Sequence, residues 1–238
     1  NFRAGIVTLD DSQPGGGVWN NLHIDNVLIR FTYRRGISVF PRSVSGTVVE
    51  NSRVEQVAYN HGMYLAGQSQ AVNNQVTHCF QGIVMSLDAE TPPELNRITG
   101  NTLSQIGNFP GCFGDAGNGV FHGQPRAIEF DNTGPGFRTV EILNNVIDDL
   151  GSAGNRGTVG IYTRRANASS LISGNTIQLT SGSSWSAGGS QAVGMLLGWS
   201  YENGFVVRNN NLFANGYGMG VMIFGSGTDA HPMILEGN

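Results

Sequence analysis

The sequence contains no lysine, and this absence removes several classes of chemistry. All 13 basic residues are arginine, against 17 acidic residues, which gives a formal net charge of −4. Lysine Schiff bases, lysine general bases and the lysine-containing P-loop are therefore excluded. Nucleic-acid binding depends on a basic face. Since only 13% of the residues are charged and acidic ones are in excess, we expect no nucleic-acid partner.

Long apolar runs and metal-binding spacings are also lacking. No apolar run approaches the ~18 residues that a membrane-spanning helix needs. The first twenty residues contain Asp10, Asp11 and Pro14 and show no signal-peptide pattern. The two cysteines, Cys79 and Cys112, match no zinc motif. We expect a mature chain without a membrane span or a cofactor, located outside the cell or at its surface.

Glycine and asparagine, in contrast, are abundant. The 238 residues include 35 glycines and 24 asparagines, a composition that argues against long helices. One short segment recurs, which we call the glycine-led repeat: Gly (once Ala), an apolar residue, any residue, and usually a second apolar residue. Its eight copies begin at Gly5, Gly36, Gly62, Gly82, Ala127, Gly160, Gly194 and Gly220. Such self-similarity indicates a repeat protein.

A second repeat places an asparagine between two alternating apolar segments. Its clearest copies span residues 98–103, 142–147, 172–177 and 207–212, and looser copies centre on Asn26, Asn51, Asn74 and Asn238. Asparagine tolerates the left-handed backbone of a tight corner, and stacked Asn side chains can form a hydrogen-bonded ladder. Alternation buries one face of each strand, so units of three short strands must stack on one another.

This pattern resembles the right-handed parallel β-helix of the pectin-lyase-like superfamily of secreted repeat proteins, over essentially the whole chain. The resemblance implies an all-β solenoid of about eight coils, with three short parallel sheets and an Asn corner ladder. The glycine-led strand would form the first sheet, and the strands before and after the Asn the other two. We predict one β-helix domain over 1–238 with a long loop insertion at 104–126, as a segment of a longer protein or assembly.

The register of the glycine-led repeat divides its side chains between the core and the outside. If Ile161 and Thr163 face the core, then Tyr162 and Arg164 face outward. The same register predicts what we call the outward column: Ser38, Tyr64, Val84, Glu129, Tyr162, Leu196 and Met222. Loops beside this face would wall a binding groove.

The main candidates for catalysis lie on this outward face. Glu129 and Asp131 are two residues apart on one strand, about 7 Å, with Tyr162 and Arg164 one rung away. In glycoside hydrolysis one acid protonates the leaving oxygen while a second carboxylate activates water or attacks. The alternative chemistry is β-elimination from a uronate, with arginine neutralising the carboxylate or acting as base. A purely structural alternative is a ladder salt bridge between Asp131 and Arg164, with Tyr162 packed over it.

His61 is a further candidate acid or base, because imidazole titrates near neutral pH; alternatively, it is a corner residue bonded to the backbone. Its string, His61-Gly62-Met63-Tyr64, is similar to strings in secreted β-helix repeat proteins, some of them carbohydrate-active. The candidate substrate-binding residues are Tyr64, Arg126, Arg165, Trp199 and Tyr201. The polygalacturonase strings Asn-Thr-Asp, Gly-His-Gly and Arg-Ile-Lys are missing, so those catalytic roles do not carry over.

Three further features leave alternatives open. An exposed apolar column would be a sugar-stacking platform, a docking face or an oligomer interface; its members are Leu196, Trp199, Met222 and Phe224. The acidic segment with Asp88, Glu90 and Glu94, or the pair Asp148 and Asp149, offers oxygen ligands for calcium, but neither follows a recognised calcium loop. Cys79 and Cys112 fall on one edge of the stack, where a disulfide would tie the 104–126 loop to the rung below.

The sequence therefore favours one of two functions. The first is an extracellular β-helix that binds a polysaccharide or other glycan over coils three to seven, either as a binding protein or as an enzyme. In the enzyme, Glu129 and Asp131 would be the catalytic residues, and Arg164, Tyr162 and His61 would assist them. The alternative is a structural or adhesive β-helix, such as a shaft segment of a tailspike, adhesin or filament. In that case the open ends would contact further chain segments or identical subunits.

Overall fold

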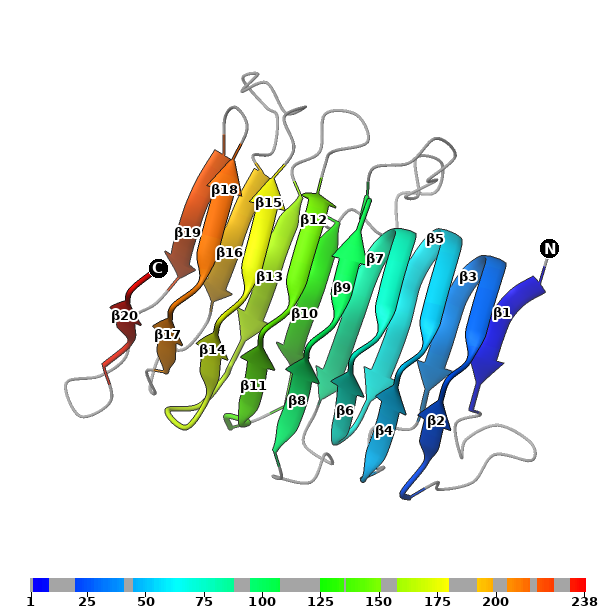
Figure 1. Cartoon of the computed structure of the whole chain (residues 1–238). Coiled ribbons are helices and arrows are strands. Elements are labelled where there is room, and N and C mark those ends of the chain that lie inside the picture. Colours follow the sequence, from blue (N-terminus) through cyan, green and yellow to red (C-terminus); the bar gives the residue numbers. More distant parts are fainter. Residues whose placement is uncertain are drawn as a thin grey trace.

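The computed structural model consists of short β-strands in the part of the chain that it describes (Figure 1). The described residues are 2–8, 20–40, 45–87, 95–107, 125–134, 136–150, 158–179, 192–198, 205–214, 218–224 and 232–238. No helix occurs among them, and hence none that is long and apolar enough to cross a membrane.

The strands form two sheets in which all pairs are parallel. The small sheet has eight strands in chain order: β2 (His23–Asp25), β4 (Thr47–Glu50), β6 (Ser69–Val72), β8 (Asn96–Thr99), β11 (Val140–Leu143), β14 (Leu171–Ser173), β17 (Val206–Arg208) and β20 (Ile234–Glu236). The large sheet has twelve: β1 (Phe2–Val7), β3 (Leu28–Val39), β5 (Arg53–Ala66), β7 (Gln75–Leu87), β9 (Thr102–Ser104), β10 (Arg126–Asn132), β12 (Val146–Leu150), β13 (Val159–Arg164), β15 (Thr176–Leu179), β16 (Ala192–Gly198), β18 (Asn211–Ala214) and β19 (Gly218–Phe224). Each strand pairs with the matching strand of the next coil, so the coils stack along one axis (Figure 1). This arrangement indicates a β-solenoid, consistent with the predicted parallel β-helix.

The number of sheets differs from the three predicted, because three strands each cover two faces of the stack. β3, β5 and β7 continue through a single left-handed residue, namely Phe31, Gln56 and His78, with φ of 58°, 58° and 54°. The first half of β7 pairs with β9 and its second half with β10, so hydrogen bonding continues around this corner. In later coils the two faces have separate strands: β9 ends at Ser104 and β10 begins at Arg126.

The eight glycine-led repeats align in the predicted register. The apolar residue after each Gly or Ala lies in one inward column: Ile6, Ile37, Met63, Ile83, Ile128, Ile161, Met195 and Val221. This column packs with those of the other faces into one continuous core, in which each fully buried aliphatic side chain contributes roughly 1.5–3 kcal/mol. Gly82 shows why glycine leads the repeat: a Cβ there would lie 2.2 Å from the backbone oxygen of Ala127 on the next coil.

The predicted Asn ladder is present at one corner of the stack. It runs through Asn74, Asn101, Asn145, Asn175, Asn210 and Asn238. Each Nδ2 donates to the Oδ1 of the next Asn, at 2.7–3.0 Å. Asn26 and Asn51, predicted as looser members, lie one position earlier, where the backbone is left-handed (φ 53° and 49°). Val27 and Ser52 occupy the ladder position in those two coils.

Candidate functional site

The outward column has the predicted register on the large sheet. Its members are successive pairing partners, from Ser38 through Glu129 and Tyr162 to Met222. Its accessibility is lower than its orientation implies, because Val84, Glu129 and Tyr162 are only 4%, 6% and 6% exposed. The column therefore faces away from the core and is nevertheless largely shielded from solvent.

Both candidate carboxyl groups lie on β10, and each has an arginine partner. Arg126 forms an ion pair with Glu129, and its guanidinium carbon lies 3.7 Å from the centroid of the Tyr162 ring. Arg164 Nη1 lies 3.5 Å from Asp131 Oδ1, which is the ladder contact of the structural alternative. The Asp131 and Arg164 side chains keep 24% and 35% exposure, so solvent reaches this second pair.

The environment of Glu129 favours its protonated form. Burial raises the pKa of Glu129 to about 7; the Arg126 charge opposes this shift and the Asp131 charge adds to it. Near neutral pH this side chain is therefore poised to give or take a proton. A carboxyl group that is partly protonated at neutral pH, with a second, more exposed carboxyl two residues further along the strand, could act with it as an acid and base pair.

His61 lies on β5, and its pairing partner on β7 is Gln81. Burial lowers the pKa of His61 to about 3, the Arg35 charge lowers it further, and a hydrogen bond with Gln81 opposes both. The imidazole is thus neutral near neutral pH, which argues against a role as proton donor. Gln81 Nε2 also lies 3.5 Å from Glu129 Oε2, so Gln81 links the two candidate residues.

Tyr64 joins the same face through stacking on arginine. The Arg35 guanidinium carbon lies 5.1 Å from the Tyr64 ring centroid and 5.0 Å from that of Phe40. The rings of His61 and Tyr64 are 5.2 Å apart. Burial lowers the pKa of Arg35, but the guanidinium remains a cation at any ordinary pH. The first coils thus carry a second guanidinium–ring contact besides that of Arg126.

The remaining candidate substrate-binding residues do not join this arrangement in the described structure. Arg165 Nη1 donates to the carbonyl oxygen of Gly134 at 2.6 Å, so its guanidinium is engaged with the segment that follows β10. Trp199 and Tyr201 lie outside the described residues.

A second outward column, missed in the sequence, consists of the residue before each repeat. From the second to the seventh copy it reads Arg35, His61, Gln81, Arg126, Val159 and Val193. It is polar in the first four of these copies and apolar in the last two. Val159 and Val193 pack with Tyr162, Leu196 and Met222 in a hydrophobic cluster separate from the main core. The predicted exposed apolar column is therefore a packed cluster at these positions, although Phe224 remains 45% exposed.

The predicted disulfide and calcium sites fall largely outside the described residues. Cys79 is buried, with Sγ 3.3 Å from the carbonyl oxygen of Thr77. No disulfide is found in the described part of the chain, which does not include Cys112, so that pairing stays a prediction. Asp88, Glu90 and Glu94 also lie outside it. Within the described segments, Asp148 included, no group of three or more His, Cys, Asp or Glu side chains is placed to hold a metal ion.

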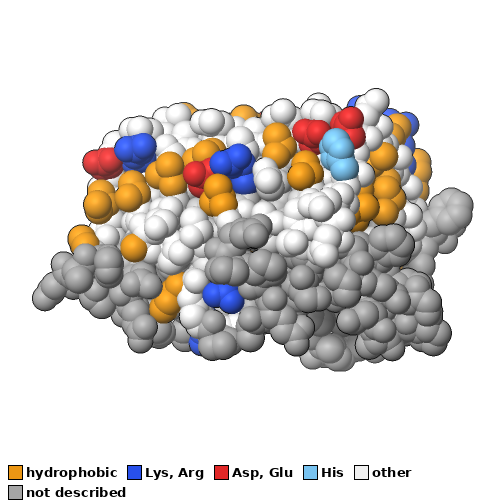
Figure 2. Space-filling model, turned by 90° about the horizontal axis from the view of Figure 1, so that it is seen from below, with side chains coloured by type: hydrophobic (Ala, Val, Ile, Leu, Met, Phe, Trp, Pro, Cys, Tyr) orange, Lys and Arg blue, Asp and Glu red, His pale blue; other side chains and the backbone are white. Residues whose placement is uncertain are grey.

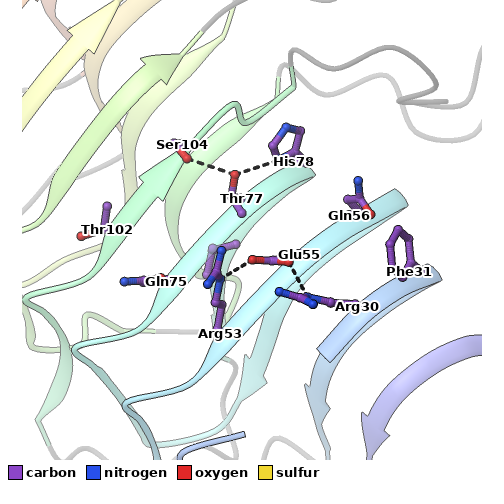
Figure 3. A pocket seen from close by; sticks show the side chains of 11 residues that line it. Arg30, Phe31, Arg53, Glu55, Gln56, Gln75, Thr77, His78, Thr102 and Ser104 are labelled. Carbon is purple, nitrogen blue, oxygen red and sulfur yellow. Dashed lines mark hydrogen bonds and ion pairs between the residues drawn. The ribbon is translucent and has the colours of Figure 1, made fainter. Parts of the chain in front are cut away.

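A groove that the sequence did not predict lies on another face of the large sheet (Figure 3). It has a volume of about 530 Å³ and lies over the first halves of β3, β5 and β7 and over β9. Its lining includes Arg30, Arg53, Glu55, Thr77, His78 and Ser104. In the sequence, this groove is indicated by a cluster of arginines at 30, 34, 35, 42 and 53. The net charge of −4, which averages over the whole chain, does not reveal this local positive charge.

On the small sheet, acidic side chains pair with Arg or His side chains of neighbouring strands. His23 Nε2 lies 2.7 Å from Glu50 Oε1, and Arg97 Nη2 lies 2.8 Å from Glu141 Oε2. Seen from below, acidic side chains lie next to Arg and His side chains among hydrophobic and uncharged ones (Figure 2). These pairs provide matched control positions for substitutions on the large sheet.

Comparison of the chain with protein-family models, curated proteins and solved structures gives no significant match. The evidence for the fold is therefore the chain's own strand pairing, the register of its glycine-led repeats and its Asn ladder.

Proposed function

We propose that this chain is an extracellular, right-handed parallel β-helix of the pectin-lyase-like class, and that it binds and hydrolyses a polysaccharide over the large sheet. The stacked parallel strands and the Asn ladder support the fold class. The observation that carries the activity is the pair of carboxyl groups on β10: Glu129 is buried beside Arg126, and the more exposed Asp131 lies two residues further along. Burial raises the pKa of Glu129 to about 7, which agrees with this role.

In the proposed reaction, protonated Glu129 gives its proton to the glycosidic oxygen as the bond to the anomeric carbon breaks. Asp131 takes a proton from the water that attacks the same carbon from the opposite side. Glu129 and Asp131 are about 7 Å apart along the β10 backbone, a spacing compatible with the carboxyl separation of roughly 6.5–9.5 Å that is typical of inverting glycosidases. Arg164, 3.5 Å from Asp131, positions that carboxylate.

The alternative is a structural or adhesive β-helix without catalysis. Two observations favour it: both carboxyl groups are paired with arginines, and Glu129 is only 6% exposed. In that case the Arg126–Glu129 pair stabilises β10 itself, the Asp131–Arg164 pair joins β10 to β13, and the repeats supply length. The two proposals differ in whether substrate reaches Glu129.

A panel of neutral and uronate-containing polysaccharides tests both. Release of reducing ends and absorbance near 235 nm would be measured for the parent chain and for Glu129→Gln and Asp131→Asn. We expect each variant to lose at least about 100-fold in rate. The control is Glu141→Gln, which changes a carboxylate paired with Arg97 on the small sheet and should leave the rate unchanged.

Three outcomes separate the possibilities. New reducing ends without absorbance support hydrolysis, whereas absorbance near 235 nm would replace hydrolysis by β-elimination. No turnover on any polymer by folded protein would overturn the enzymatic proposal in favour of the structural alternative. Thermal unfolding of each variant shows whether a lost activity reflects a lost fold.

A further inference from the structure

The groove over β3, β5, β7 and β9 exists because the chain turns tightly beside it. Phe31, Gln56, His78 and Gln105 all have left-handed backbones, with φ between 51° and 58°. The pairing of Thr32 with Val57 and of Val57 with Cys79 aligns the first three. Each of β3, β5 and β7 thus rounds the corner through one residue. The outer side of these strands therefore forms an open-sided trough along the stack (Figure 3).

Phe31 is the most unusual residue of this trough. A bulky side chain with positive φ is rare, and such backbones tend to occur at functional sites. The side chain is also 61% exposed, so burial of the ring does not offset the cost of its backbone. The result is an aromatic ring held in solvent at the edge of the groove.

The groove carries an excess of positive charge. Arg30 Nε donates to Glu55 Oε2 at 2.7 Å, and Arg53 Nε pairs with the other carboxylate oxygen. Two guanidinium groups thus share one carboxylate, which leaves one surplus positive charge. The arginine side chains are 47% and 51% exposed, whereas Glu55 is 13% exposed. Because both arginines pair with Glu55 through Nε, their terminal nitrogens can donate to a ligand anion as a fork.

The rest of the lining is rich in hydroxyl and amide groups. Thr77 pairs with Ser104 and Gln75 with Thr102 on neighbouring strands. Ser104 Oγ donates to Thr77 Oγ1 at 3.0 Å, and Thr77 Oγ1 lies 2.8 Å from His78 Nδ1 (Figure 3). Such groups suit the many hydroxyls of a sugar, and the ring of Phe31 suits an apolar sugar face.

We propose that this groove binds an acidic oligosaccharide, one that carries carboxylate or sulfate groups. The anionic group binds the terminal nitrogens of Arg30 and Arg53, and one sugar packs on Phe31. The lining favours a saccharide over a single-stranded nucleic acid, which needs several open rings for base stacking. The nearby rings of Tyr33 and Tyr59 stack on each other, with centroids 5.5 Å apart, so their facing sides are closed to bases. The site is separate from Glu129 and does not depend on the proposed hydrolysis.

Binding to the intact chain tests this site. The probes are oligogalacturonate for carboxylate, dextran sulfate for sulfate, neutral dextran, and a dT20 oligonucleotide, each measured by isothermal titration calorimetry at low salt. We expect one or both acidic polymers to bind and neutral dextran not to bind. The double variant Arg30→Gln/Arg53→Gln should weaken binding about tenfold or more. Phe31→Asn removes the ring but tolerates the left-handed backbone, and should also weaken it.

Controls assign binding to this groove. Arg97→Gln removes an arginine from a similar ion pair on the small sheet and should bind as the parent does. The proposal is overturned if neither acidic polymer binds, if Arg30→Gln/Arg53→Gln binds as tightly as Arg97→Gln, or if dT20 binds more tightly than both polymers.

Discussion

Replacing Asn145 by alanine should destabilise the solenoid more than any substitution of an exposed asparagine. Asn145 is fully buried in the middle of the Asn ladder. Its Oδ1 accepts from the backbone N–H and from Nδ2 of Asn101, both at 2.9 Å. Its Nδ2 donates to the Ile98 carbonyl oxygen and to Asn175 Oδ1, also at 2.9 Å. The substitution therefore removes four hydrogen bonds from a site closed to water.

The magnitude follows from which groups lose a partner. Asn101 Nδ2 keeps its bond to the Ala71 carbonyl oxygen, and Asn175 Oδ1 still accepts from the backbone N–H of residue 145. The Asn101 N–H and the Ile98 oxygen both lose their bond to Asn145. Each buried polar group left without a partner costs about 1–3 kcal/mol. We expect a loss of about 3–4 kcal/mol, part of it from the small cavity.

Urea unfolding followed by circular dichroism measures this loss. Asn211→Ala is the matched control, because Asn211 follows the same corner in another coil and is exposed. We expect the control to change the free energy of unfolding by less than about 0.5 kcal/mol. If Asn145→Ala cost no more than the control, the ladder would not contribute as its hydrogen bonds imply, and the reasoning would fail.

Two further predictions concern pH and the glycine-led repeat. The pKa of Glu129 is raised to about 7, so its contribution to stability is lost as the pH rises from 4.5 through 7. The pKa of His61 is lowered to about 3, so its contribution to stability is lost as the pH falls below 6.5. Between pH 4.5 and 6.5 these slopes, up to ~1.4 kcal/mol per pH unit, oppose each other. The Glu129→Gln variant, which keeps only the His61 effect, should therefore become more stable as the pH rises. The His61→Gln variant, which keeps only the Glu129 effect, should become less stable as the pH rises. Unfolding midpoints without pH dependence in both variants would refute the two pKa shifts. Gly82→Ala should cost about 3 kcal/mol because its Cβ would meet the Ala127 oxygen, whereas Gly220→Ala meets nothing within 4 Å and should cost little in thermal unfolding.

The register of the stack could be predicted because it depends on local features. The residue at the head of each repeat must be small where the next coil approaches closely, as at Gly82, and alternation assigns each following side chain to one face. The Asn corner likewise depends on one residue and its left-handed neighbour. These constraints are visible in each copy, so eight copies fix the alignment of Ile83 with Ile128 across a long insertion.

The sheet count and the accessibility of the outward column could not be predicted, for different reasons. Phe31 and Gln56 turn the chain with left-handed backbones, a conformation that neither residue type favours. Orientation away from the core also does not give exposure, since the 6% exposure of Glu129 depends on side chains from other coils and segments. The second outward column, formed by the residue before each repeat, could have been predicted from the sequence, because Gln81 occupies the same position in its copy as His61 does in its own.

The energetics of Glu129 favour the proposed catalytic role over the structural alternative. An ion pair that only stabilises the fold should favour the ionised acid and lower its pKa. Here burial outweighs Arg126, and the difference between about 7 and 4.5 favours the protonated form by ~3 kcal/mol. Above pH 7 that difference opposes folding, so a purely structural role would be served better by glutamine. Glu129 also lies where the preceding column changes from polar Arg126 to apolar Val159, and this boundary supplies both its desolvation and its partner. A carboxyl group kept at such a position at the expense of stability is what proton transfer near neutral pH requires.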